Sequence, residues 1–325
     1  MRPAGLARGP LVWWTMTKFI VTRAFYSVIT LWLLVTIIFA AVRITGDPTE
    51  MMDDSRGDEA YKAQLKKDWG LDQAVHVQYG RYIFNLLQGD LGHSFEKALP
   101  VREIYFQRLP NSIKLGIAGF VISIALGIPL GMLSAMKVNT WWDSFGKVFA
   151  LLGLSVPNFF VGLLLIIVFA VGLGWLPAIG KGDSFFDWQH LIMPAFALGW
   201  YFSGSMVRIT RSSTLEVLGS DYIKLARLKG VPEWLVMAKH ALKNSMIPVL
   251  TLAGLNLVIM VNVAIAIEVV FNWPGVGQLL FDGMSNRDFP MVQGIVLMSG
   301  VMIVVLNFLI DILYAYVDPR IRLVK

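Results

Sequence analysis

The residues that could do chemistry in this chain gather in a polar stretch, residues 208–245, between two apolar stretches of membrane length. The stretch carries seven Lys and Arg residues against three acids, and its middle part, residues 221–234, reads DYIKLARLKGVPEW. This mixture of basic and apolar side chains is suited to binding a partner protein rather than to catalysis. The alternative is an ordinary basic loop on the inner side of a membrane, because such loops are generally rich in Lys and Arg.

The start of this segment predicts an amphipathic helix with a charged side and an apolar side. The charged side holds Asp221, Lys224 and Arg227, and the apolar side holds Leu225 and Leu228. A helix of this kind, lying off the membrane, would present a basic strip and an apolar strip to a partner.

The residues after this helix predict a turn and a second helix. Gly230 suits a tight or left-handed turn, because glycine adopts positive φ angles without steric cost. Pro232 stands where the second helix would begin, a position at which its missing N–H costs nothing. Glu233 suits the positive end of that second helix.

Patterns for catalysis, nucleotide binding or metal binding are absent from the sequence. The chain has no cysteine and no Gly-x-x-x-x-Gly-Lys-Ser/Thr phosphate loop, so it is not expected to hydrolyse ATP itself. His76, His93 and His190 are too scattered for the usual spacing of metal ligands. We therefore expect no catalytic residue, no metal site and no cofactor in this chain.

Polar and helix-breaking residues in and after a late apolar stretch are candidates for lining a translocation path or gate. They are Asn256, Asn262, Glu268, Pro274 and Gly275. Ionisable residues inside membrane spans are functional candidates by default. Glu268 lies near the end of its stretch, however, where burial costs less, so structural pairing is the favoured interpretation and path lining the alternative.

The composition places most of the chain in a membrane. Of its 325 residues, 56% are hydrophobic and only 15% are charged, whereas roughly a quarter of a soluble domain is charged. Helices of about 20 apolar residues cross the ~30 Å hydrocarbon core. Six stretches meet this length: residues 19–42, 113–136, 145–171, 191–207, 247–271 and 291–317. Because lipid cannot satisfy backbone polar groups, the predicted fold class is an all-α membrane protein with six transmembrane helices.

The charges of the connecting segments predict the orientation. Basic excess alternates with its absence from one segment to the next, which places both termini in the cytoplasm. The same alternation accounts for the net charge of +6 without nucleic-acid binding. The expected divisions are a cytoplasmic tail (1–18), a first transmembrane helix (19–44), an extracytoplasmic segment (45–110) and a five-helix core (111–325) that contains the cytoplasmic loop 208–246. The first helix lacks a small-residue cleavage site and is expected to remain as an anchor.

Shorter patterns predict local features within these divisions. Residues 58–69 and 75–87 each predict a short amphipathic helix in the extracytoplasmic segment. Pro157 predicts a kink in the third apolar stretch. Gly127 and Gly131, four residues apart, predict close packing of the second stretch against another helix.

The polar stretch resembles the cytoplasmic Glu-Ala-Ala loop of ABC importer permeases, in the form used by the oligopeptide/dipeptide/nickel transport family. Ala226 and Gly230 keep the spacing of that loop, and KHALKNSMIP follows as in the family. Lys224 stands where the general motif has Glu, and Leu225 where it has its first Ala. Eight other fragments are similar, in order, to the first of the paired permeases: GDLGHS, LPNSIKL, IPLG, SVPNFFVGLLL, LGWLPA, NWPGVG, NRDFPMVQG and DPRIR. On this resemblance the ATPase-coupling residues are Ser220, Asp221, Tyr222, Lys224, Ala226, Arg227, Lys229 and Gly230.

The resemblance implies a multi-pass permease of the bacterial inner membrane that imports di- or oligopeptides by alternating access. The implied partners are a second homologous permease, two cytoplasmic ATPases that bind ATP and Mg²⁺, an extracytoplasmic solute-binding protein and the lipid bilayer. Uptake of nickel, glutathione, an opine or an oligosaccharide by the same machinery is the nearest alternative. An ion-coupled secondary carrier or a membrane scaffold is the alternative of a different class. No inverted repeat is evident, which weakens the carrier interpretation.

Overall fold

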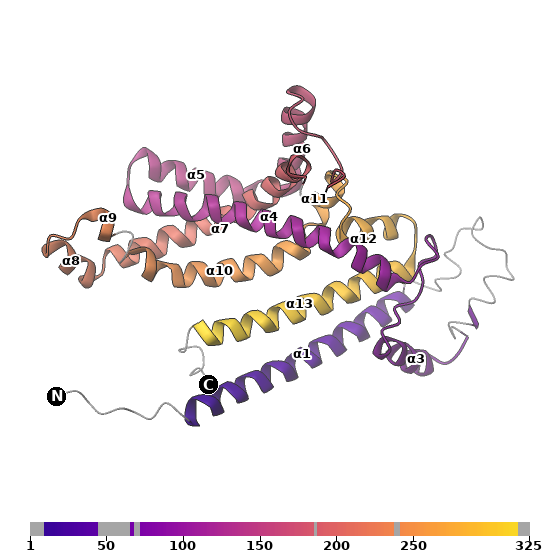
Figure 1. Cartoon of the computed structure of the whole chain (residues 1–325). Coiled ribbons are helices and arrows are strands. Elements are labelled where there is room, and N and C mark those ends of the chain that lie inside the picture. The colour runs from indigo at the N-terminus through magenta and orange to yellow at the C-terminus, as the bar shows by residue number, and fades with distance from the viewer. Residues whose placement is uncertain (1–9, 45–65, 68–71, 185–186, 237–240, 318–325) are drawn as a thin grey trace. The chain divides into compact units, whose positions relative to one another are not determined.

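The computed structural model describes residues 10–44, 66–67, 72–184, 187–236 and 241–317 of the chain, and the side chains of 10–19, 43, 261–263 and 313–317 fall outside that description. The described residues form helices joined by turns (Figure 1), with a single bridge between His93 and Pro100. The elements are α1 (Pro10–Ile44), α3 (Val75–Leu87), α4 (Val101–Met136), α5 (Trp141–Ser155), α6 (Asn158–Leu165), η2 (Ile166–Gly172), α7 (Trp188–Leu218), α8 (Asp221–Leu228), α9 (Glu233–Leu235), α10 (Leu242–Val263), α11 (Ile265–Val270), α12 (Val276–Ser285) and α13 (Phe289–Val317). The all-α prediction is confirmed for this part of the chain.

Several of these helices have the length and composition of membrane spans. Among the described residues, four helical segments are long and apolar enough to cross a membrane: Ile20–Val42, Val101–Met136, Leu242–Met260 and Phe289–Ile312. The pair formed by α5 and α6–η2 would make a fifth span, bent by 102°. The remaining predicted stretch, 191–207, lies in α7, whose Ser and Gly residues lower its hydropathy. Six spans therefore stay a prediction.

Some predicted helices are confirmed, and some of the long apolar stretches are divided into two helices. The predicted helix 75–87 is confirmed as α3, whereas most of the predicted helix 58–69 lies outside the described residues. The third stretch is broken at Pro157, between α5 and α6, which confirms the predicted kink. The fifth stretch is interrupted at Ala264, between α10 and α11, by a break that no proline marks.

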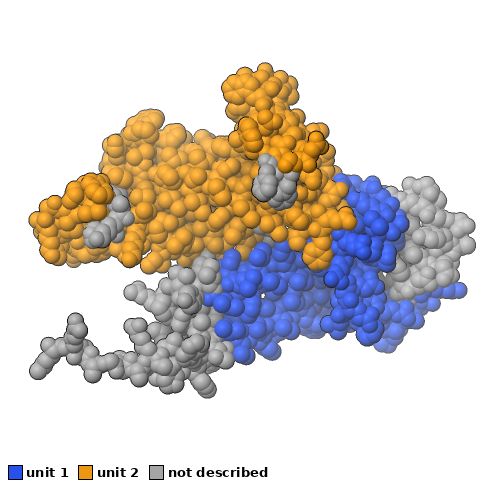
Figure 2. Space-filling model, viewed as in Figure 1, with its two compact units in different colours: residues 1–105, 282–325 blue, residues 106–281 orange. Residues whose placement is uncertain are grey.

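The helices are grouped into two compact units (Figure 2). Unit 1 comprises Met1–Tyr105 and Asp282–Lys325, and unit 2 comprises Phe106–Phe281. The residues predicted as one core, 111–325, are therefore shared between the two units.

In unit 1, α1 runs beside α13 (Figure 1), and Arg23 forms an ion pair with Asp311 at 3.1 Å. The buried carboxylate of Asp288 precedes α13 and accepts from the N–H of Met291 at 3.2 Å. It also accepts from the hydroxyl of Ser94 at 2.5 Å. Two of the family-like fragments, GDLGHS and NRDFPMVQG, therefore meet at this carboxylate.

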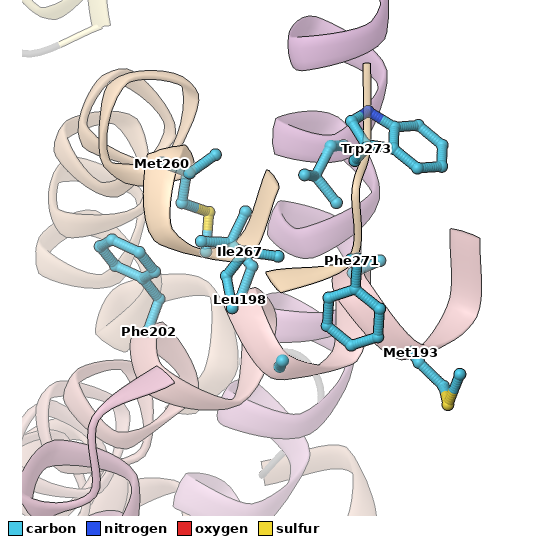
Figure 3. Packing of buried hydrophobic residues seen from close by; sticks show 11 residues of the cluster. Met193, Leu198, Phe202, Met260, Ile267, Phe271 and Trp273 are labelled. Atoms are coloured by element: carbon cyan, nitrogen blue, oxygen red, sulfur yellow. The ribbon is translucent and has the colours of Figure 1, made fainter. Parts of the chain in front are cut away.

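Unit 2 is built around α7, which contacts α5, α6, α10 and α11. Fourteen of its 31 residues are buried. Its core cluster takes Leu198 and Phe202 from α7, Met260 from α10 and Ile267 from α11, together with Trp273 beyond α11 (Figure 3). The burial explains why α7 can carry small polar residues: most of them face protein rather than lipid.

Glycines allow α4 to approach α7 closely, as the spacing of Gly127 and Gly131 predicts. A Cβ on Gly131 would lie 2.6 Å from the Cβ of Thr210 and 2.8 Å from the carbonyl oxygen of Val207. A Cβ on Gly127 would overlap the Cβ atom of Met206. Neither neighbour is the end of a flexible side chain, so a larger residue would have to move the helix itself.

Gly131→Ala is therefore expected to destabilise the folded protein by about 1–3 kcal/mol, the usual cost of overpacking. The same substitution at Gly80, inside α3, meets nothing within 4 Å and should stabilise by roughly 0.5–1 kcal/mol through helix propensity. The measurement is the temperature at which half of the detergent-solubilised protein leaves its monodisperse size-exclusion peak. Equal midpoints for the two variants would contradict the close approach of α4 and α7.

Candidate functional site

The predicted coupling segment has the predicted local structure. The helix α8 covers Asp221–Leu228, and Gly230 has a φ of +76°, in the left-handed region. The N–H of Val231 donates to the carbonyl of Ala226 at 3.2 Å, and the N–H of Gly230 donates to that of Arg227 at 2.9 Å. These bonds satisfy the carbonyls at the end of the helix, as in other helices that end on a left-handed glycine. Pro232 immediately precedes the short helix α9.

One large apolar residue of α8 is buried, while the others are exposed; among the exposed ones, the hydroxyl of Tyr222 accepts from the side-chain amide of Asn244 on α10 at 3.0 Å. Ile223 is fully buried. By contrast, Leu228 is 85% exposed and Trp234 is 70% exposed, and Leu225 and Tyr222 are also exposed. Together these four exposed residues form what we call the α8–α9 apolar surface. Large apolar side chains exposed close together in the chain make this short element a candidate interaction site.

Two ion pairs order the charges of this segment. Lys224 contacts Asp221 at 3.0 Å within α8. The guanidinium of Arg227 donates to both carboxylate oxygens of Glu233, at 2.6 and 3.1 Å, and so bridges the turn between α8 and α9. This bond lowers the pKa of Glu233 below its ordinary value. Arg227 is therefore engaged across the turn of the segment, whereas Lys224 is paired with Asp221 on the same exposed side of α8.

The remaining coupling residues lie around these. Ser220 precedes α8 and donates its hydroxyl to the carbonyl of Val217. Lys229 is exposed and ends the helix. The structure thus brings the eight predicted coupling residues into one helix–turn element, and their contact with an ATPase stays a prediction.

The predicted path residues do not form one group. Asn256, on α10, is buried and donates to the hydroxyl of Ser205 on α7 at 3.3 Å. The side chain of Asn262 lies outside the described residues. Glu268, Pro274 and Gly275 do lie together, at the end of unit 2 opposite α8 (Figure 1).

Glu268 is a buried carboxylate that holds the start of α12. Its side chain accepts from the hydroxyl of Ser112 at 2.6 Å. It also accepts from the N–H groups of Gly277 and Gln278, at 2.7 and 3.1 Å. The N–H of Val276 donates to the hydroxyl of Ser112 at 2.8 Å. The first three N–H groups of α12 therefore all donate to the side chains of Ser112 and Glu268. A carboxylate at a helix N-terminus is stabilising.

The chain around Glu268 is shaped for this contact. Gly275 leaves room for the carboxylate, because a Cβ there would overlap it. The side chain of Asn111 donates to the carbonyl of Pro274 at 2.8 Å, and the indole N–H of Trp273 donates to the carbonyl of Asn111 at 3.0 Å. This geometry fits the structural interpretation of Glu268. Sequence reasoning assigned no role to Asn111 or Ser112, although both lie in the family-like fragment LPNSIKL.

Two family profiles match the chain. The profile described as "Binding-protein-dependent transport system inner membrane component" matches residues 127–323, and the corresponding N-terminal profile matches residues 16–116. The chain belongs to this family of binding-protein-dependent permeases. The resemblance inferred from the sequence fragments is thereby confirmed.

Curated relatives agree with this assignment along nearly the whole permease. This chain is 39% identical over 308 residues to the glutathione transport system permease protein GsiC of Salmonella paratyphi A. The match covers 94% of this chain and 99% of that protein. It is 37% identical over 308 residues to GsiC of Escherichia coli K12, with the same coverage. A solved structure of the MetNI methionine ABC transporter matches 66% of this chain and 96% of its own, with a TM-score of 0.54 and 14% identity, which shows a shared fold. The permease is thus a multi-pass inner membrane subunit of an ABC importer and not its catalytic subunit.

Substitution of Glu268 tests its structural role. Glu268→Leu leaves the N–H groups of Gly277 and Gln278 without acceptors and is expected to destabilise the protein by about 1–3 kcal/mol for each. Glu268→Gln keeps one carbonyl oxygen near them and should cost clearly less. Thermal size-exclusion profiles of the two variants check this. If both melted like the wild type and only transport changed, the residue would line a path instead of capping α12.

Proposed function

We propose that two cytoplasmic ATPases drive this permease and that one of them docks on the α8–α9 apolar surface. The single observation that carries the proposal is the combination of exposed Leu228 and Trp234 with a buried anchor, Ile223, on the same short element. An element held firmly by one face and apolar on the other can pass movement of a partner into unit 2. A bound ATPase shifts the equilibrium between two permease states only if it contacts them with different free energies.

The charges of the segment support a protein partner at the cytoplasmic side. Residues 208–245 carry a net charge of +4, from seven basic and three acidic residues, and basic loops face the cytoplasm. This orientation gives six spans with both termini inside, α7 being the fourth span, covered by the other helices. ATP and Mg²⁺ are bound by the partner ATPases in this proposal, and the permease supplies the path.

The other partners follow from the family. A second homologous permease completes the path, and an extracytoplasmic binding protein delivers the solute. We propose a peptide-class solute, with glutathione as the first candidate because the two relatives compared above are glutathione permeases. Glutathione is itself a small peptide, so the two proposals share one chemistry.

Reconstitution tests this function. The permease is purified with its associated subunits, placed in proteoliposomes, and supplied with the binding protein together with labelled glutathione or a labelled dipeptide. Liganded binding protein is expected to raise ATP hydrolysis and to drive uptake into the lumen, and ATP omission should abolish the uptake. An ion-coupled carrier would instead take up the label with an ion gradient alone, and a scaffold would do neither.

Gly230 gives a test of the coupling element by itself. Its φ of +76° lies in the left-handed region, which β-branched residues rarely adopt, whereas Asn adopts it more readily. Because a Cβ at Gly230 meets nothing within 4 Å, crowding plays no part. Gly230→Val should lower ATPase recovery on pull-down and uptake per ATP, and Gly230→Asn should stay near the wild type. Normal coupling in the Val variant would count against docking at this turn.

A further inference from the structure

A buried carboxylate ties three helices together at the end of unit 2 that carries α8. Asp143 lies in the first turn of α5, and its side chain has no exposed surface. Its Oδ1 atom accepts from the hydroxyl of Ser134 on α4 at 2.6 Å and from Nε of Arg211 on α7 at 2.7 Å. Its Oδ2 atom accepts from Nη2 of Arg211 at 3.1 Å. One side chain of α5 thus binds one residue of α4 and one of α7.

Two further donors complete the shell of this carboxylate. The backbone N–H of Asn139, in the turn between α4 and α5, donates to Oδ2 at 3.1 Å. Lys147, one turn further along α5, places its ammonium 2.8 Å from the same oxygen. Of these contacts, those with Arg211 and Ser134 join different helices, whereas the contact with Lys147 stays within α5.

The arrangement fixes geometry more than it adds stability. A buried ion pair gains little over a well-packed apolar pair, but breaking it by removing one partner is costly. A bidentate Arg–carboxylate contact also sets the angle and the distance between its two carriers. Arg211 is only 24% exposed, so water does little to loosen the contact. The cluster therefore holds the ends of α4, α5 and α7 in one arrangement.

This arrangement is joined directly to the coupling helix. Arg211 lies in the uninterrupted helix α7, which ends at Leu218, and only Gly219 and Ser220 separate it from α8. A displacement of α8 therefore reaches Arg211 through about two turns of continuous helix. Packed side chains and hydrogen bonds between rigid elements are the usual carriers of such coupling.

We propose that Asp143 and Arg211 form a clamp that makes the ends of α4, α5 and α7 move as one body with α8. Both are positioning residues, which act through the helix that leads into α8. The proposal rests on the proposed function, because it concerns how movement of a docked ATPase enters the permease. Without the clamp, α8 and the end of α7 can follow the ATPase while α4 and α5 stay behind.

The test uses the complete transporter in proteoliposomes and measures ATP hydrolysis and labelled glutathione uptake in the same preparation. Asp143→Asn and Arg211→Met should each lower the solute transported per ATP by about fivefold or more, within the range of ordinary coupling between sites. ATP hydrolysis itself should persist, because the nucleotide sites lie on other subunits. The double variant should lose no more coupling than either single variant, since both disrupt the same charged bidentate contact.

Two matched controls separate the clamp from a general loss of charge. Lys147→Met removes a cation from the same carboxylate but no link between helices. Lys137→Met removes an exposed cation in the turn between α4 and α5. Both should keep the solute transported per ATP at the wild-type value.

The outcomes distinguish this inference from the proposed function. If the wild-type complex shows no uptake driven by ATP and binding protein, the proposed function fails. If the wild type couples and both clamp variants couple equally well, the clamp is overturned. Arg211→Lys, which keeps the charge but loses the bidentate contact, covers the case in which the first two variants do not assemble. Failure of Arg211→Lys to assemble, or its full coupling, would also overturn the clamp.

Discussion

The constraint on which the structure depends is that a helix end inside an apolar environment has no water to bind its backbone groups. The permease meets it with buried carboxylates. Glu268 satisfies the first turn of α12, Asp288 that of α13, and Asp143 binds the turn that precedes α5. Each also accepts from a serine hydroxyl of another segment: Ser112 for Glu268, Ser94 for Asp288 and, across the turn from α4, Ser134 for Asp143. The same side chains that make helix breaks possible therefore fix which segments lie beside them.

Much of this fold could be predicted, because the relevant signals are local. Helix α3 was predictable from its periodicity, and the turn after α8 from Gly230, whose lack of a Cβ is decisive at positive φ. The close contact of Gly131 with α7 was also predictable, since small residues four apart are typical of helix packing. Pro157 marked the break that bends the third apolar stretch by 102°. At Gly230, Gly131 and Pro157, a single residue type carries the backbone consequence.

The rest could not be predicted because it depends on pairs of residues far apart in the chain. No local pattern links Ser112 with Glu268, 156 residues later, or Asp143 with Arg211. The break at Ala264, between α10 and α11, carries no proline or glycine that would predict it. Glu268 shows the same limit: its position in the sequence favoured structural pairing, but its three hydrogen-bond donors could not be named from the sequence. Only a signal that links two distant positions of the sequence could have predicted these buried polar pairs.

The positions of these contacts suggest how movement at α8 could reach the opposite end of unit 2. Helix α4 carries Ser112 near the cap of α12 and Ser134 at Asp143, roughly 33 Å apart at the rise of an α-helix. Between these points, Gly131 rests directly on Thr210 of α7. Because neither helix can slide past such a contact without a clash, α4 and α7 have to shift together. The cap of α12 would then respond to a displacement of α8, and the stiffness of the α4–α7 pair would decide how much movement reaches it.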